Sequence, residues 1–501
     1  MKIKKHFITR VALSISAFVV VMDSTITNVS TSVISGSLGM SMFEGGLISS
    51  VFGLSNALSI PLMKLLSSTL GEKKTYIFSF LLFVLSSIFC GLSLGMFPLL
   101  FFRVIQGVSS GPIIPLSLSI LLSTYRKKDR TSGVSLWSSI VVIAPAVGPV
   151  IGGVICKYLS WRWLFFINAP VGLICLNLLF KDFFSSSKDD TASSDCFDIL
   201  GYFSVSIFMI LWQVIISHDN SFSFDNPLDF YLVFLCILFL FLFFISQIYG
   251  ENPMFDVSLF LNKNYLIGTV CLSCSYLINL STVLPIFLIE VHGYDLLSAG
   301  LACASAGIPP LLISSKIKKI MSIVNPKHLV FTGFVLYAVC LHWRTSMFQT
   351  NTSFESVCIS QFFIGVASTL FFIPITDITI SYVKRKRIGS ALTLNCFCKT
   401  ICSAIGTSIT YRIWNSRLFL HTSRLSDSVN YYSELFRSEN SIMISKGLSY
   451  YNSLSFIKNE ILVAGKIESI NDLFFCGVIL NVILACVILM STSVEKYPSP
   501  Y

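Results

Sequence analysis

The chain has 501 residues, of which 54% are hydrophobic and only 12% are charged, and its mean hydropathy is +0.78. Soluble domains carry about 25% charged residues, so this composition excludes an ordinary soluble protein and indicates one that crosses a membrane many times. The formal net charge is +10. Most basic residues lie in alternate loops between apolar segments, which does not indicate a nucleic-acid-binding protein.

Apolar segments of membrane-crossing length follow one another along the chain, because about 20 residues span the hydrocarbon core. The basic start, MKIKKHFITR, resembles a signal peptide, but Asp23 interrupts the next apolar run and no small-residue cleavage site is obvious. We therefore expect a retained first helix. The fourteen predicted spans are 11–31, 45–66, 76–94, 98–122, 132–155, 163–180, 197–217, 229–248, 266–290, 297–314, 328–344, 355–382, 388–411 and 473–491.

The distribution of basic residues predicts the topology. One set of alternate loops is rich in Lys and Arg, whereas the opposite short loops hold only Lys157, Arg162 and Arg344. Because basic residues favour the cytoplasmic side, both termini are expected in the cytoplasm, and so are the polar loops 182–196 and 249–264. The loop 412–472 is expected to be external and, being long, to have some structure of its own.

Two small-residue segments recur at one offset. Gly107 and Gly365 are 258 residues apart, and so are Gly148 and Gly406. The same offset places Gln361 opposite Arg103. A shared offset suggests an internal duplication, as in transporters built from two helical bundles.

The duplication divides the chain into three parts. An amino-terminal six-helix bundle is predicted at 1–181 and a carboxyl-terminal six-helix bundle at 265–501. Residues 182–264 hold two inserted transmembrane helices with cytoplasmic linkers. The expected fold class is therefore an all-α polytopic membrane protein.

Two charges stand inside predicted helices of the first half. Asp23 and Arg103 would each be costly in lipid, so each is expected to seek the other as a partner. A carboxylate whose protonation can change is what proton coupling requires. A static structural pair is the alternative interpretation.

Several motifs resemble those of the major facilitator superfamily. RVIQGVSSGPIIP, from residue 103, resembles motif B, and SIVVIAPAVGPVIGGVI, residues 139–155, resembles motif C of its proton-coupled exporters. VMDSTITNVS, residues 21–30, and WRWLFFINAPVG, residues 161–172, resemble the first-helix and sixth-helix motifs of the fourteen-helix drug:proton antiporters, the EmrB/QacA type. The likeness to EmrB-type inner-membrane exporters of Gram-negative bacteria covers nearly the whole chain.

The resemblance implies a major facilitator fold and roles for particular residues. Proton coupling is expected at Asp23, Arg103 and Asp377. Motif B corresponds to Arg103, Gln106, Gly107, Gly111 and Pro112, and motif C to Pro145, Gly148, Pro149, Gly152 and Gly153. The motif C face is expected to seal the cytoplasm-side pathway and favour export, although plain close packing explains the same small residues.

Two further sets of residues follow from the family pattern. A cytoplasmic gating loop is expected at Gly71, Lys73 and Lys74, whereas its repeat, SSKIKKIMSIVN, lacks the glycine pattern. Gln361 and Lys399 are possible cavity residues. The family usually has an arginine where this chain has Lys399, so a bidentate contact is not expected there.

Metal binding, ATP hydrolysis and enzymatic catalysis are not expected. Cys398 and Cys402 share a helical face, but Cys396 does not, so the densest cysteine group is interpreted as apolar filler. No GxxxxGK[ST] motif and no catalytic cluster is recognisable. The proton gradient would be the energy source, with no cofactor.

Export of hydrophobic or amphipathic drugs against protons across the bacterial inner membrane is the favoured function. Small molecules, protons and membrane lipid are the expected partners, and the resemblance adds a periplasmic adaptor and an outer-membrane channel. Export of a specific metabolite, siderophore or lipid, and a non-transporting receptor on the same fold, are the alternatives.

Overall fold

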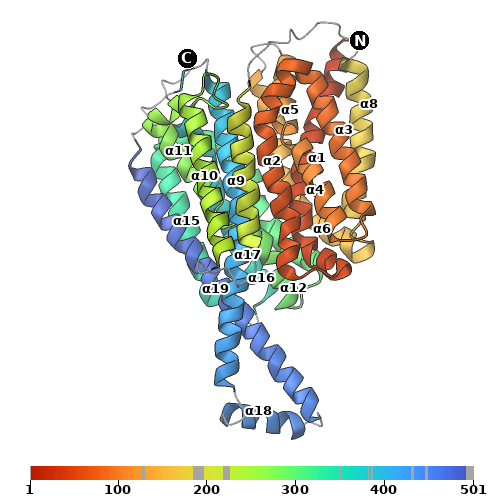
Figure 1. Ribbon diagram of the computed structural model, residues 1–501, viewed down its shortest axis with the longest axis vertical. Helices are drawn as coiled ribbons and strands as arrows, with labels where there is room; N and C mark the ends of the chain where they lie inside the picture. Colours follow the sequence, from red (N-terminus) through yellow and green to blue (C-terminus); the bar gives the residue numbers. More distant parts are fainter. Residues whose placement is uncertain are drawn as a thin grey trace.

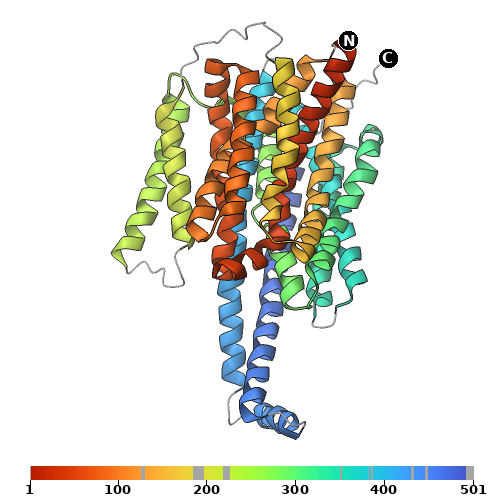
Figure 2. The same ribbon diagram turned by 90° about the vertical axis from the view of Figure 1, so that its right-hand side faces the viewer.

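The computed structural model describes residues 2–125, 130–183, 197–217, 226–349, 352–381, 383–384, 387–429, 434–445 and 449–491. All regular structure in these ranges is helical, so the predicted all-α class is confirmed. Both termini lie at one end of the molecule, called the terminal end below. At the opposite end, the hairpin end, α17 and α19 extend beyond the other helices and carry α18 (Figures 1 and 2).

The helices fall into two bundles and an inserted pair. The first bundle holds α1 (Lys2–Leu38), α2 (Met42–Leu70), α3 (Glu72–Leu92), α4 (Met96–Ser110), α5 (Ile113–Ser123), α6 (Arg130–Tyr158), α7 (Trp163–Phe166) and α8 (Asn168–Phe183). The inserted part holds α9 (Ile199–Ser217), α10 (Pro227–Tyr249) and η2 (Val257–Leu261). The second bundle holds α11 (Lys263–Cys274), α12 (Leu280–Glu290), α13 (Leu296–Ala304), η3 (Ser305–Gly307), α14 (Ile308–Ile323), α15 (Pro326–Met347), α16 (Phe354–Ile380), α17 (Ile388–Ser428), α18 (Glu434–Ser445) and α19 (Tyr450–Leu489).

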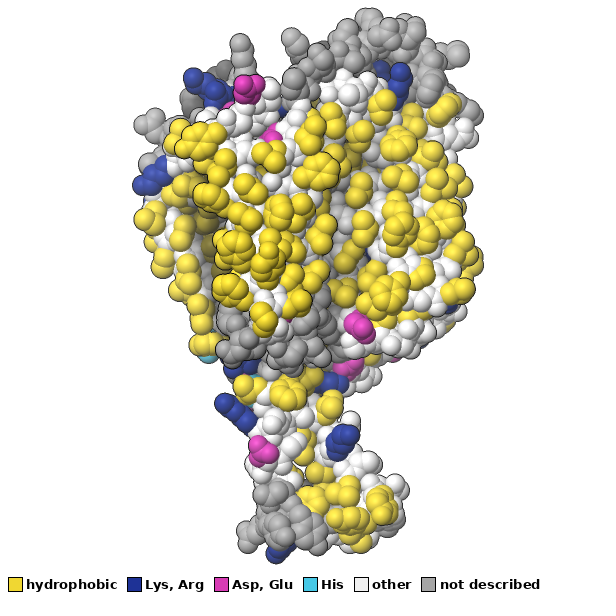
Figure 3. Space-filling model, in the orientation of Figure 1, with side chains coloured by type: hydrophobic (Ala, Val, Ile, Leu, Met, Phe, Trp, Pro, Cys, Tyr) yellow, Lys and Arg dark blue, Asp and Glu magenta, His cyan; other side chains and the backbone are white. Residues whose placement is uncertain are grey.

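Eleven helical segments in the described residues are long and apolar enough to cross a membrane. They match eleven of the fourteen predicted spans. The other three coincide with α6, with the α11 and α12 pair, and with α15. Hydrophobic side chains cover the outer faces of the bundles, while charged side chains gather at the two ends and on the hairpin (Figure 3). The count of fourteen stays a prediction.

The segment 412–472, expected to be a long connection with some structure of its own, is mostly helical in the described residues. Helix α17 continues to residue 428, α18 follows, and α19 begins at residue 450. The Ser- and Asn-rich composition suggested a connection. In the structure the two long helices pack closely at Gly465, where an added Cβ would lie only 2.6 Å from the Thr422 hydroxyl. The helix suggested by the apolar spacing at 452–474 is part of α19.

Polar contacts hold the base of the hairpin. Lys466 of α19 lies 2.7 Å from Glu290 at the end of α12, which joins the hairpin to the bundle, and Asp472 of α19 lies 2.8 Å from His421 of α17, which joins the two hairpin helices. These partly exposed pairs contribute little stability individually, but they orient the hairpin at its base.

The glycines related by the 258-residue offset occupy equivalent positions. Gly107 of α4 packs against the backbone of Phe52 in α2, and Gly365 of α16 packs against Ala306 where α13 leads into α14. Gly148 of α6 touches α1, and Gly406 of α17 touches Tyr276 in the segment between α11 and α12. The matching contacts support the duplication inferred from the offset.

Motif C joins the two bundles. A Cβ at Gly153 would lie 2.5 Å from the Leu296 carbonyl oxygen, and one at Gly300 would collide with the Pro149 carbonyl oxygen. Nearby, Lys157 and Asp295 form an ion pair of 2.7 Å, and the hydrogen bond from Lys157 lowers the pKa of Asp295 to about 2. Helix backbones therefore approach closely where side chains are absent.

This contact lies on the part of α6 nearer the hairpin end, because α6 starts at the terminal end and its Gly/Pro face comes after residue 144. The sealing role expected for motif C stays a prediction, and so does the cytoplasmic placement of the termini. If the terminal end is cytoplasmic, this contact lies toward the opposite, outer end of the molecule.

Substitution of Gly148 is expected to break the α1–α6 contact, because an added Cβ would lie 3.2 Å from the Met22 carbonyl oxygen and against the Thr25 hydroxyl. We expect Gly148→Ala to cost about 1–3 kcal/mol and Gly148→Leu to abolish transport. Expression, elution profile and export are measured together. Gly36→Leu is the matched control, since open space surrounds Gly36 in α1. Full export by Gly148→Leu at normal expression would contradict the packing account.

Candidate functional site

Asp23 and Arg103 form an ion pair inside the first bundle. The Arg103 Nη1 atom donates a hydrogen bond of 3.0 Å to Asp23 Oδ2, and both side chains are inaccessible to solvent. Asp23 comes from α1 and Arg103 from α4. The structure therefore places together the two charges that the sequence singled out, while their role in proton coupling stays a prediction.

Three neutral side chains complete a network around the pair. Arg103 Nη1 also donates to Gln106 Oε1 at 2.7 Å, and Gln106 Nε2 donates to the Ser87 hydroxyl at 2.6 Å. Asn168 Nδ2 donates both to Asp23 Oδ1 and to the Ser87 hydroxyl. Four helices, α1, α3, α4 and α8, thus contribute one connected set of polar groups.

Aromatic and polar surroundings decide how stable the pair is. The Arg103 guanidinium lies 4.8 Å from the Phe165 ring centroid and 5.1 Å from that of Phe52. Such faces attract a cation in a desolvated site. Arg103 Nε has no hydrogen-bond partner, so one donor of the guanidinium remains unsatisfied. Asp23 therefore experiences two opposed effects, burial that disfavours its charge and an arginine that favours it.

The small residues of motif B seat α4 against α2. A Cβ at Gly107 would lie 2.5 Å from the Phe52 carbonyl oxygen, and one at Gly111 would collide with Ser59 and lie 2.6 Å from the Asn56 carbonyl oxygen. Pro112 caps the start of α5, where the helix resumes after a short interruption. This packing fixes the height of Arg103 relative to α2.

The second-half residues do not join this network. Gln361 is buried in α16, Asp377 lies three residues before the end of that helix, and Lys399 lies in α17. The hydrogen bonds around Asp23 reach none of these three side chains. The sequence grouped Asp377 with Asp23 and Arg103, and the structure leaves it in the other bundle.

The predicted gating loop is the tight connection between α2 and α3. Gly71 has φ of 84°, a conformation that favours glycine, and Lys73 and Lys74 follow in the first turn of α3. Glu72 accepts a hydrogen bond of 2.9 Å from Ser119 of α5. The loop therefore links three helices at the terminal end.

Two members of the network escaped prediction. Ser87 lies in an ordinary apolar helix, so no local pattern marks it. Asn168 stands within WRWLFFINAPVG, the stretch that resembled the sixth-helix motif, and a polar residue inside an apolar motif was the available signal.

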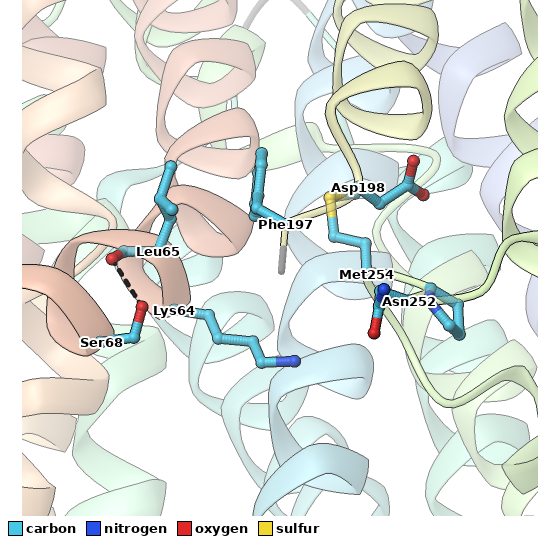
Figure 4. Close-up of a pocket in the computed structure, with 8 residues that line it drawn as sticks. Lys64, Leu65, Ser68, Phe197, Asp198, Asn252 and Met254 are labelled. Atoms are coloured by element: carbon cyan, nitrogen blue, oxygen red, sulfur yellow. Dashed lines mark hydrogen bonds between the residues drawn. The ribbon is translucent and has the colours of Figure 1, made fainter. Parts of the chain in front are cut away.

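A small pocket lies elsewhere, at the terminal end, where the inserted helices join the first bundle (Figure 4). Asp198 at its edge accepts hydrogen bonds from Ser246 and Gln247 of α10. Its lining residues are Lys64, Leu65, Ser68, Phe197, Asp198, Asn252, Pro253 and Met254. None of the predicted site residues lines it. In the described part of the chain, no group of three His, Cys, Asp or Glu side chains is arranged to hold a metal.

The family model of the Major Facilitator Superfamily matches residues 13–407. The chain is 36% identical to the probable multidrug resistance protein EmrY of Escherichia coli (strain K12), over 86% of this chain and 85% of that protein. It is 35% identical to the multidrug export protein EmrB of the same strain, over 85% and 83%. Identity to the fatty acid resistance protein FarB of Neisseria gonorrhoeae is 30%, over 94% and 93%.

Solved structures share the fold at low identity. The D-xylose-proton symporter matches with a TM-score of 0.64 and 12% identity, over 99% of both chains. A bacterial homolog of the human lysosomal transporter Spinster matches with a TM-score of 0.62 and 14% identity, over 98% of both chains.

Removal of one member of the buried pair is expected to destabilise the protein more than removal of both. Arg103→Met leaves Asp23 without its cation, which costs about 3–5 kcal/mol at a buried site. The double variant Asp23→Leu/Arg103→Met removes both charges and should regain most of that loss. Thermal unfolding of the purified variants in detergent measures the order. If the loss of stability in the double variant equals the sum of the losses in the two single variants, the two side chains do not interact.

Proposed function

The chain belongs to the major facilitator superfamily, and on that premise we propose that it is a proton-coupled antiporter which exports hydrophobic or amphipathic compounds. The buried Asp23–Arg103 pair is the observation that carries this proposal. The relatives named for multidrug export and for fatty acid resistance support the same substrate range. An enzymatic activity is not proposed.

The chemistry of the pair suits a proton switch. When Asp23 is ionised, Arg103 is held between two acceptors, the carboxylate and the Gln106 amide oxygen. When a proton neutralises Asp23, the electrostatic attraction is lost and Gln106 remains as the acceptor. The guanidinium then shifts toward Gln106, and α1 is released from α4. Arg103 keeps a hydrogen-bond partner in the protonated state but loses its counter-charge, and this cost disfavours the closed packing around it and favours a rearrangement of the helices.

A chain of close contacts connects this switch to the interface between the bundles. The helix turn that holds Asp23 also holds Met22 and Thr25, which touch Gly148 of α6, and Ile26 touches Gly152. The same α6 face contacts α13 of the second bundle through Gly153. A displacement of α1 on protonation would therefore act directly on the contact that closes the hairpin end.

The membrane placement follows from the charge distribution. We propose the bacterial inner membrane, with the terminal end in the cytoplasm and the hairpin on the outer side. Protons would then enter from the hairpin side and substrate would leave on that side.

The hairpin is the proposed site of a periplasmic adaptor that leads to an outer-membrane channel. The hairpin projects beyond the bundles, and hydrophobic side chains gather on it (Figure 3). Ile442 and Ile444 of α18 are 44% and 46% exposed, and Tyr451 at the start of α19 is 80% exposed. Apolar side chains held outside the membrane belt suit a helical partner.

Asp23→Asn is expected to abolish proton-driven export while leaving substrate binding intact, because the amide retains hydrogen bonding to Asn168 but cannot exchange a proton. Export from proteoliposomes under an imposed pH gradient, and substrate binding to the same preparation, are both measured. Glu355→Gln, which removes an exposed carboxylate in the first turn of α16, is the matched control in the second bundle. Continued uphill export by Asp23→Asn would move the coupling site elsewhere, with Asp377 as the next candidate.

The paired substitution Ile442→Ser/Ile444→Ser is expected to reduce resistance in cells without reducing transport in proteoliposomes. The physical reason is that these side chains are exposed and contribute little to folding, but would be buried by an adaptor. Deletion of 420–450 is the stronger form of the same change. Full resistance with the deletion would show that the hairpin is only a connection between α17 and α19.

The same proteoliposome assay distinguishes the alternatives. Transport of one compound class only would indicate a specific metabolite, siderophore or lipid exporter. Failure of every substrate to move, with normal folding, would indicate a non-transporting receptor.

A further inference from the structure

The second bundle contains a broken helix. Helix α11 ends at Cys274 and α12 begins at Leu280, and the five residues between them are not helical. Helix α17 supports this break, because Asn279 N donates to the Thr410 hydroxyl at 2.9 Å and Asn279 Nδ2 donates to that of Thr407 at 3.1 Å. Non-helical backbone inside a membrane is tolerated only where it is buried in protein or lines a water-filled cavity. In transporters, such interrupted helices form substrate and ion sites.

A lysine faces this break. The Lys399 Nζ atom lies 5.1 Å from the ring centroid of Tyr276, within the break, and 5.0 Å from that of Phe372 in α16. All three side chains are partly exposed rather than buried. No ion pair joins Lys399 to a carboxylate in the described part of the chain. The amine therefore has two aromatic faces but lacks a counter-charge.

The duplication shows that the fold does not require this lysine. The 258-residue offset relates Lys399 to Val141 and Phe372 to Ile114. The same offset relates Tyr276 to Phe18, which also packs against the core of the first bundle. All three counterparts are apolar, and Ile114 and Val141 pack against the core of the first bundle. The amine of Lys399 and the hydroxyl of Tyr276 are therefore specific to the second half.

Among the described residues, a second cation in the same bundle also forms no ion pair. Arg344 of α15 is 1% exposed, and its Nε and Nη2 atoms have no hydrogen-bond partner in the described part of the chain. Its guanidinium lies 5.6 Å from the Phe348 ring centroid and 5.8 Å from that of Phe474. In the first bundle, by contrast, Arg103 is neutralised by Asp23. The interior of the second half thus favours an anion.

We propose that Lys399, Tyr276 and Phe372 bind the acidic head group of an amphipathic anion, a carboxylate or sulfonate with an apolar body. This proposal rests on the proposed export function and names the substrate class. The amine would form a charge-assisted hydrogen bond with the head group, and the two rings would cover the first carbons of the apolar body. Exchange of one inward proton for one outward monovalent anion moves two charges per cycle in the same electrical direction, so a membrane potential would drive it.

The test uses the full-length protein in proteoliposomes with an imposed proton gradient. The probes are decanesulfonate, decyltrimethylammonium and decanol, which share one apolar chain and differ in head-group charge. A sulfonate is chosen because it does not carry protons across the bilayer. Lys399→Met should raise the KM for decanesulfonate by about tenfold or more, since a lost charged partner costs at least about 1.4 kcal/mol. The KM for decyltrimethylammonium should not rise, and Lys399→Arg should restore the wild-type value for the anion.

Controls separate the possible failures. Lys263→Met removes an exposed lysine at the start of α11 and should leave all KM values unchanged. An equal loss for all three probes in Lys399→Met, or no change for decanesulfonate, would overturn the anion site while leaving the export function standing. A wild-type protein that moves none of a broad set of substrates would overturn the export function itself. If Tyr276→Phe leaves the KM for decanesulfonate unchanged while Lys399→Met raises it, the amine of Lys399 is supported as the group that binds the anion.

Discussion

A carboxylate and a guanidinium inside a lipid-embedded bundle are stable only when every helix around them contributes to their solvation. Asp23 and Arg103 meet this requirement through Gln106, Ser87 and Asn168, which replace the water that the two ions would otherwise need. The network spans four helices, so the position of each helix along its axis and its rotation about that axis must keep these hydrogen bonds formed. The small residues serve this constraint, since Gly107 holds α4 against α2 and Gly148 holds α6 against α1.

Close backbone contact also makes the first bundle sensitive to its own charge state. Side chains of ordinary size between helices would absorb a small displacement, whereas glycine contacts at van der Waals distance transmit it. The contacts run from α1 through α6 to α13 without an intervening large side chain at Gly148, Gly152 and Gly153. The Lys157–Asp295 ion pair lies at the same interface, and its exposure means that its energy is small. The interface between the bundles is therefore held mainly by packing, which can be released by a shift of one helix.

Sequence reasoning predicted what composition and single motifs encode. Apolar segment length predicted the helical class, and the isolated charges predicted the Asp23–Arg103 contact, because two intramembrane ions have few other partners. It missed Ser87, since a lone serine in an apolar helix carries no pattern, and the coupling role expected for Asp377 in the second half stays a prediction. The extended hairpin was also missed, because a Ser- and Asn-rich composition describes a wet surface equally well in a helix and in a loop. The end of the molecule that motif C closes depends on where along α6 the glycines fall, which requires the helix to be placed in three dimensions.

The two halves carry their charged and polar side chains at different positions, as the 258-residue offset shows. The first half keeps an acid and a base together, and at the positions that correspond to Phe18, Ile114 and Val141 the second half carries Tyr276, Phe372 and Lys399. Conversely, the offset places the neutral Gln361 where the first half has Arg103. A symmetric pair of ion pairs would let either half bind a proton, and coupling would then be ambiguous. In the proposed antiport, a neutralised pair in one bundle and an amine without an ion pair among the described residues of the other would separate the proton from an anionic substrate in space. Each could then bias the contact between the bundles independently.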